Sequence, residues 1–154
     1  MAQPEFLISA CLCGHCVRYD GSHKRVPELA HLLDAGRALA VCPEQLGGLP
    51  TPRPPCEQAG NRVWDAAGND RTAAFEAGAQ AVLELCRRYA IHTVIFKENS
   101  PSCGVHAVYD GTFSGHKISG EGMTARLLRQ HGIRVLSEEE YPAQIIGIKD
   151  PVTG

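Results

Sequence analysis

The sequence predicts a single α/β domain spanning residues 1–154, with a short, mostly parallel sheet flanked by helices. Short apolar or β-branched runs alternate with longer segments of helical periodicity, which is typical of a parallel sheet covered on both faces. The length suits one domain. The proline-rich residues 50–55 form a rigid stretch that is too short to link two domains.

Four strands are expected. The first is residues 4–9, because Phe6-Leu7-Ile8 is a short apolar run of the kind found in buried strands. The others are residues 38–41, 91–96 and 133–136. Parallel sheets bind ligands beyond the carboxyl ends of their strands, so residues that directly follow these segments are the first candidates for a site.

Three helices are expected between the strands, and a helix or turn after the last one. Residues 27–35 begin with Pro27, which suits a first helical turn, and precede a glycine that suits a helix end. Residues 70–90 form the clearest helix, with Asp70 as its cap and apolar side chains along one face. The other segments are residues 124–131 and 141–148.

Charge and hydropathy exclude several classes of protein. The net charge is −2 and there is no strongly basic block, which argues against a protein that binds duplex nucleic acid. No run approaches the roughly 20 apolar residues of a membrane span, and the start of the chain lacks a targeting pattern. We therefore expect a cytoplasmic protein that is not bound to a membrane and is a monomer or weak dimer.

Seven cysteines make metal binding or thiol chemistry the leading expectation. An odd number in a reducing compartment argues against a disulfide framework. Cys11, Cys42 and Cys103 each follow one of the first three expected strands, directly or after a short loop. Three strand ends thus deliver three thiols to the side of the sheet where α/β proteins build sites.

The remaining cysteines have other interpretations. Cys86 falls on the apolar face of the long helix and is expected to pack in the core, and Cys56 lies in the proline-rich loop without evident chemistry. Cys13 and Cys16 have the spacing of a thiol–disulfide exchange motif, but their surroundings predict a loop that ends in an Asp-Gly turn. A zinc-binding or thiol-redox module that uses Cys13 and Cys16 is the alternative function.

The number of candidate thiols bears on the metal species. Structural zinc sites usually complete four protein ligands, often as two close pairs, and the Cys13/Cys16 pair has no second close pair later in the chain. A [4Fe–4S] cluster is normally held by four thiolates. With only three, one iron would keep an open position and act as a Lewis acid, for which sulfur is a preferred ligand.

The sequence resembles the thiouracil desulfidase family, formerly a family of unknown function. The resemblance spans about residues 6–140 in the family's order. Its segments are SACLCG (9–14), VRYDG (17–21), VCPE (41–44), GGLPTPRPP (47–55), KENSPSCG (97–104), YDGTF (109–113) and GEG (120–122).

The resemblance implies an iron–sulfur enzyme that converts 2-thiouracil or 4-thiouracil to uracil and hydrogen sulfide without net redox change. It implies a [4Fe–4S] cluster bound by Cys11, Cys42 and Cys103, with one iron not ligated by the protein and open to the substrate sulfur. The expected partner is a small thiolated pyrimidine base or nucleoside. The thiols of Cys13, Cys16 and Cys56 depart from the family pattern.

Several polar residues near the three thiols are candidates for catalysis and substrate binding. Glu44 stands two residues after Cys42 and is the expected general base. Ser100 is the preferred hydrogen-bond donor to the reacting group, and Ser102 is expected to bind substrate, although a Ser-Pro sequence also favours a simple turn. Tyr19 and Asp20 are expected to orient or stack on the pyrimidine.

Two further segments receive less specific expectations. Arg53 could pair with an acid in the pocket wall, but a solvated loop arginine is the preferred interpretation. Residues 111–122 lack a phosphate-binding fingerprint, so we expect a flexible lid or a plain loop there.

Overall fold

A computed structural model describes residues 3–140 and contains the expected parallel sheet. Its strands are β1 (Phe6–Ser9), β2 (Ala38–Val41), β5 (Thr93–Phe96) and β8 (Arg134–Ser137). They pair in the order β2-β1-β5-β8, and every pair is parallel. The prediction of a mixed α/β chain with a mostly parallel sheet is confirmed.

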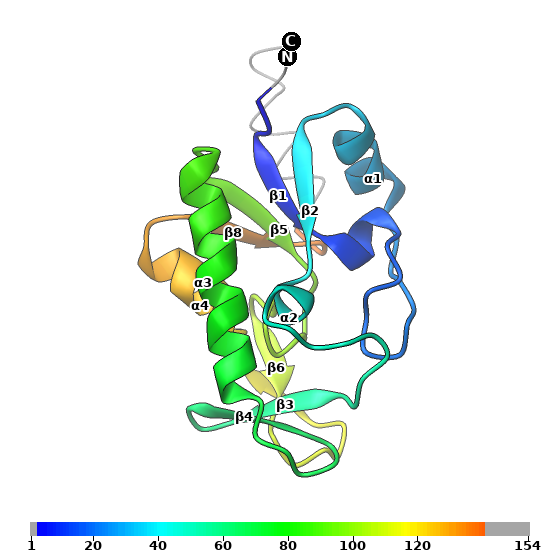
Figure 1. The fold of residues 1–154 in the computed structure, drawn as a ribbon, viewed down its shortest axis with the longest axis vertical. Helices are drawn as coiled ribbons and strands as arrows, with labels where there is room; N and C mark the ends of the chain where they lie inside the picture. Colours follow the sequence, from blue (N-terminus) through cyan, green and yellow to red (C-terminus); the bar gives the residue numbers. More distant parts are fainter. Residues whose placement is uncertain (1–2, 141–154) are drawn as a thin grey trace.

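Helices cover both faces of this sheet (Figure 1). One face packs on α1 (Pro27–Asp34), and the other packs on α3 (Thr72–Arg88) and α4 (Met123–Gln130). The alternation of side chains along β1 explains the two cores. Ile8 packs with the residues of α1, whereas its neighbour Leu7 packs with those of α3 and α4.

The expected helices differ from the observed ones by one or two residues at their ends. The prediction placed them at residues 27–35, 70–90 and 124–131. Such differences are ordinary because helix ends fray. The expected segment 141–148 lies outside the described residues. Among residues 3–140, no helix has the length and apolar character required to cross a bilayer.

Two antiparallel hairpins lie beyond the carboxyl ends of the sheet, and the sequence analysis missed both (Figure 1). One pairs β3 (Cys56–Ala59) with β4 (Arg62–Asp65), and the other pairs β6 (Ala107–Tyr109) with β7 (Lys117–Ser119). Three of these strands are largely polar and β6 has only three residues, so they lack the apolar runs that identify buried strands. The expectation of a lid or loop over residues 111–122 is therefore wrong at β7.

Two short helices follow the first two strands. The 3-10 helix η1 (Ala10–Cys13) follows β1, and α2 (Pro43–Leu46) follows β2. The expected loop around Cys13 is thus partly helical. The helix α2 lies very close to α3, and this contact fixes the position of α2. The contact needs a glycine at residue 78, because a Cβ atom there would lie 2.0 Å from the carbonyl oxygen of Pro43.

Candidate metal centre and active site

A pocket of about 450 Å³ opens where β1, β2 and β5 end, and it brings the three candidate thiols together. Cys11 reaches it from η1, Cys42 from the start of α2, and Cys103 from the turn after β5. The strand order reverses between β1 and β5, which is the place where open α/β sheets bind ligands. The sequence placed these residues at strand ends, and the parallel sheet turns that placement into one site.

Cys11 and Cys103 are buried, Cys42 is partly buried, and the three thiols influence one another. Burial, together with the neighbouring Cys42, raises the pKa of Cys11 from 9.0 to about 11. Burial also raises the pKa of Cys42 and that of Cys103, where Cys42 and Cys11 add to the effect. Three thiolates would repel one another here, so a positively charged metal centre is what would hold all three in the deprotonated form.

The arrangement suits a cluster better than a single ion. Within residues 3–140, no group of three His, Cys, Asp or Glu side chains converges as the ligands of one metal ion do. In a [4Fe–4S] cluster each thiolate binds a different iron, so its ligands stand further apart. Three thiols around one pocket therefore fit the ligand set of a cluster.

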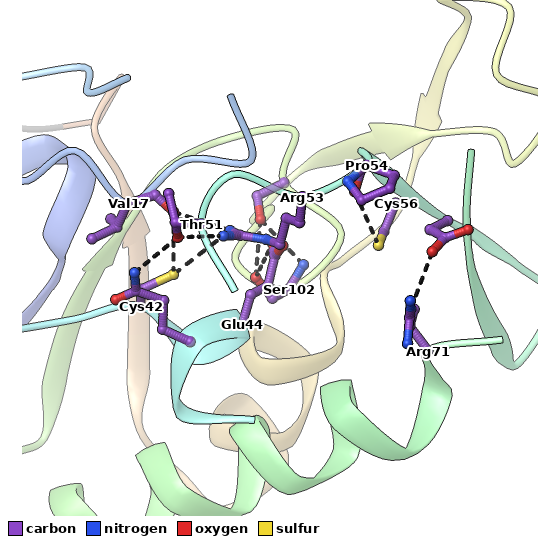
Figure 2. Close-up of polar contacts among 12 residues, drawn as sticks. Val17, Cys42, Glu44, Thr51, Arg53, Pro54, Cys56, Arg71 and Ser102 are labelled. Carbon is purple, nitrogen blue, oxygen red and sulfur yellow. Dashed lines mark hydrogen bonds and ion pairs between the residues drawn. The ribbon is translucent and has the colours of Figure 1, made fainter. Parts of the chain in front are cut away.

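Glu44 and Arg53 form a buried ion pair at the wall of the pocket (Figure 2). The Arg53 Nε atom lies 2.9 Å from Glu44 Oε1, and the two side chains are only 4% and 12% exposed. The Arg53 guanidinium also donates to the carbonyl of Val17 at 3.1 Å and to the hydroxyl of Thr51 at 2.9 Å, and its Nη2 lies 4.0 Å from Cys42 Sγ. The preferred interpretation of Arg53 as a solvated residue is therefore wrong.

The other oxygen of Glu44 contacts the serines before Cys103. The Ser102 hydroxyl donates to Glu44 Oε2 at 3.2 Å and lies 3.6 Å from Cys103 Sγ. The Ser100 hydroxyl oxygen accepts the backbone N–H groups of Ser102 and Cys103 at 3.2 and 3.1 Å. Because these two N–H groups use the lone pairs of that oxygen, its own proton is directed to the Ser102 hydroxyl, which lies 3.0 Å away.

Glu98 is a structural residue of the site that the sequence analysis missed, although it belongs to the KENSPSCG segment. It is 4% exposed, and its Oε1 accepts the N–H groups of Val105 and His106 at 2.7 and 2.8 Å. Burial acts to raise the pKa of Glu98, but its hydrogen bonds from the backbone, including that of Ala107, leave it lowered. The charged carboxylate thereby holds both ends of the turn that carries Cys103.

Comparisons with known proteins found a matching family model, a similar solved structure and a relative of similar sequence. A family model described as 2-thiouracil desulfurase matches residues 6–140. The chain belongs to the 2-thiouracil desulfurase family. A solved structure of the [4Fe-4S]-dependent thiouracil desulfidase TudS superposes with a TM-score of 0.90 at 47% identity, covering 95% of this chain and 98% of that one. YbbK of Bacillus subtilis (strain 168), described as uncharacterized, is 44% identical over 144 residues, which cover 87% of this chain and 95% of YbbK.

Tyr19 and Asp20 were both expected to orient or stack on the pyrimidine, but only Tyr19 lines the pocket. Tyr19 lines the pocket and is 38% exposed. Asp20 is exposed and is not among the lining residues; its Oδ1 accepts the N–H and hydroxyl of Ser22 at 3.0 and 2.5 Å. These bonds lower the pKa of Asp20 and close the turn after Tyr19.

The four remaining cysteines of this desulfurase-family chain lie in different surroundings, and all seven are free thiols. Cys13 packs in the core beside α1, Cys16 is exposed, and Cys86 is a buried residue of α3 in the core. Cys56 differs from its sequence interpretation as a loop residue without evident chemistry, because it begins β3 and lines the pocket. Burial raises the pKa of Cys56 to about 12.

Proposed function

We propose that the protein is a [4Fe–4S]-dependent desulfidase that hydrolyses 2-thiouracil or 4-thiouracil to uracil and hydrogen sulfide. One observation carries the proposal: Cys11, Cys42 and Cys103 line a single pocket together with Glu44. Family membership supports it, as does the likeness to TudS, whose dependence on a [4Fe-4S] cluster is stated in its name.

The ligands proposed for the cluster are Cys11, Cys42 and Cys103. A [4Fe–4S] cluster held by these three thiolates would keep one iron without a protein ligand, and it would supply Lewis-acid chemistry toward the sulfur of the substrate. The protein itself supplies the buried, polar wall. Since the pKa values of these thiols are raised, cluster binding would release protons to solvent.

The proposed reaction exchanges a C=S group for a C=O group without oxidation or reduction. Water supplies the oxygen, its two protons leave with the sulfur as hydrogen sulfide, and the ring is released as uracil. Glu44 takes a proton from the attacking water as general base. The ion pair with Arg53 fixes one carboxylate oxygen, which leaves Oε2 directed at Ser102 and the reaction site.

The two serines have complementary proposed roles. Ser102 contacts both Glu44 and Cys103, so its hydroxyl lies between the base and a cluster ligand and is placed to bind substrate. In the proposed reaction Ser100 turns its proton from the Ser102 hydroxyl, 3.0 Å away, to the negative charge that develops on the substrate during attack. A donor held by two backbone N–H groups is preorganised for that task.

The proposed substrate is a small thiolated pyrimidine base or nucleoside. Tyr19 contacts its ring from the rim of the pocket, and Asp20 contributes through the turn that presents Tyr19. We infer no binding to duplex nucleic acid or membranes. The cytoplasm is the proposed setting because a cluster held by cysteines needs a compartment that keeps thiols reduced.

The test is anaerobic reconstitution with iron and sulfide, followed by incubation with 2-thiouracil and 4-thiouracil in ¹⁸O-labelled water. We expect hydrogen sulfide and uracil in equal amounts, with one labelled oxygen in the uracil. A reconstituted cluster without sulfide release from either base would contradict the desulfidase. The Cys16→Ser variant is the control for the thiol-redox alternative, and it should retain full activity because Cys16 is exposed outside the pocket.

A further inference from the structure

Phe113 has an unusual position at the rim of the pocket. Its side chain lines the pocket yet remains 39% exposed, and it follows β6 in the loop of residues 110–116. Its backbone has a φ angle of 57°, in the left-handed region. That conformation is a clear outlier for a bulky residue, and glycine or asparagine would adopt it more readily.

The loop that carries Phe113 is held firmly in this conformation. Glu57 Oε1 accepts the N–H groups of Gly111 and Phe113 at 2.9 and 3.2 Å, and the N–H of Asp110 donates to the carbonyl of His116 at 2.9 Å. A Cβ atom on Gly111 would lie 2.5 Å from the carbonyl oxygen of Gln58, so the loop rests directly on β3. The structure thus maintains a strained aromatic residue where strain is often kept for ligand binding.

Folding does not explain this choice of residue. Phe113 belongs to none of the clusters of buried apolar side chains, and its exposed ring contributes little to the core. An exposed aromatic ring beside a pocket would be stabilised by a flat ligand that covers it, because aromatic side chains stack on the faces of bases.

We propose that Phe113 stacks on the pyrimidine ring and makes the pocket selective for planar aromatic thiocarbonyl compounds over puckered or aliphatic ones. This inference rests on the proposed function, whose substrate it specifies. Phe113 is accordingly a substrate-binding residue that recognises the flat ring, whereas the residues near the thiols act on the C=S group.

The test compares the binding of uracil with that of 5,6-dihydrouracil to the reconstituted protein by calorimetry. The two compounds share their amide groups, but dihydrouracil is puckered and not aromatic. We expect wild type to prefer uracil by about 5- to 30-fold, the lower part of the range for base–aromatic stacking, since the ring is partly exposed. The Phe113→Leu variant should lose this preference and Phe113→Tyr should keep it.

Two further variants separate stacking from other effects. Tyr89→Ala removes an aromatic side chain of similar exposure, 36%, outside the pocket and should bind like wild type. Phe113→Gly relieves the backbone strain, so it should unfold at the wild-type temperature or above while losing the preference for uracil. A preference that survives in Phe113→Leu or Phe113→Gly would overturn the proposal.

Kinetics distinguish this inference from the proposed function. If wild type releases sulfide from thiouracil, Phe113→Leu should raise KM by about 5- to 30-fold and leave kcat within about twofold, because stacking acts equally on substrate and transition state. An unchanged KM would contradict the role of Phe113 alone. Absence of sulfide release from wild type would instead contradict the desulfidase, while the calorimetric comparison would still test the aromatic contact.

Discussion

The carboxyl end of the sheet and the helix-packed core both bury cysteines, but they do so for different reasons. Cys86 is 2% exposed among apolar neighbours, and burial alone raises its pKa to about 11. Cys11 and Cys103 are nearly as buried, at 8% and 4%, yet other thiols also act on both, together with charged groups at Cys11 and serine hydroxyls at Cys103. Burial and a raised pKa therefore do not by themselves distinguish the proposed cluster ligands from a thiol of the core.

The same contrast applies to the backbone of the two regions. The core consists of regular helices and strands, whereas the pocket is built from the short segments that follow them: η1, α2 and the turn before Cys103. These segments depend on specific contacts, such as the hydrogen bonds that Glu98 accepts from the backbone N–H groups of Val105 and His106, after the turn that carries Cys103. Substitutions in the pocket should thus change chemistry, and substitutions in the core should change stability.

Replacing single cysteines by alanine is expected to give the largest difference between the pocket and the core, measured as retention of the cluster. Cys11→Ala, Cys42→Ala or Cys103→Ala should abolish cluster retention, since two thiolates cannot replace the three-ligand set. Cys86→Ala should keep the cluster and lose only about 1–2 kcal/mol of unfolding free energy, because a small buried side chain is shortened. Iron content and visible absorption after anaerobic reconstitution measure the first effect, and thermal unfolding measures the second.

A full iron content in any of the three pocket variants would contradict the proposal that these three thiols bind the cluster and the core thiol does not. Loss of iron from Cys86→Ala would do so as well, unless its circular dichroism shows that the chain has unfolded. The Cys56→Ala variant sharpens the result, since Cys56 lines the pocket but is not a proposed ligand. It should retain the cluster.

Glu44→Gln should separate chemistry from cluster binding. The amide keeps the shape of the side chain but cannot accept the proton of water, so turnover should fall by roughly 10²–10⁴-fold with the cluster intact. The measurement is the rate of sulfide release per iron. Glu84→Gln, on the exposed face of α3, is the matched control and should retain the wild-type rate. Unchanged turnover in Glu44→Gln would remove this carboxylate from the mechanism.

Gly78→Ala tests whether packing in the core sets the geometry of the pocket. The added methyl group would lie 2.0 Å from the carbonyl oxygen of Pro43, so α2 must move and carry Cys42 and Glu44 with it. Activity should fall by about 10²-fold, the effect of misplacing reacting groups by about 1 Å. Sulfide release measures this loss.

The control for Gly78→Ala is Ala77→Gly, an exposed position on the same helix. It weakens α3 by about 1 kcal/mol without pushing on α2, so it should lower the unfolding temperature but keep activity. Equal activity in the two variants would show that the close approach of α2 and α3 does not control the site.

The sequence was informative where periodicity or position along the chain carries the signal. Apolar runs predicted the strands of the sheet, and the parallel sheet then placed Cys11, Cys42 and Cys103 together. The hairpins were missed because their strands are only three or four residues long and, except for β6, largely polar, and β7 is exposed throughout. Their position also explains why sequence reasoning assigned no role to Cys56 or Phe113.

Side-chain partners were harder to predict than positions. Arg53 lies in a proline-rich segment that suggests solvent exposure, and only the folded chain brings Glu44, Val17 and Thr51 around its guanidinium. The partners of Glu98 were equally hard to predict, since the backbone N–H groups from which it accepts hydrogen bonds lie up to nine residues later in the chain. Contacts between distant segments leave no local pattern, so the ion pair and the anchored turn required the structure.

The smallest expected effect concerns pH and distinguishes the core thiol from the pocket thiols in the cluster-bound protein. Cys86 has a pKa of about 11 when folded and an ordinary value of 9.0. Its neutral form is therefore favoured in the folded state, and this stabilisation is present below pH 9 and is lost as the pH rises toward 11. Wild type should lose about 2 kcal/mol more than Cys86→Ala by pH 11, since each pKa unit corresponds to about 1.4 kcal/mol.

Anaerobic denaturant unfolding of both proteins from pH 8 to pH 11 would measure this difference. Thiols bound to iron are already deprotonated and should not titrate in this range, so the difference between the two proteins isolates Cys86. Parallel stability curves would mean that burial does not hold the core thiol neutral. A core thiol that titrates beside pocket thiols that do not would show that the two regions use the same side chain in different protonation states.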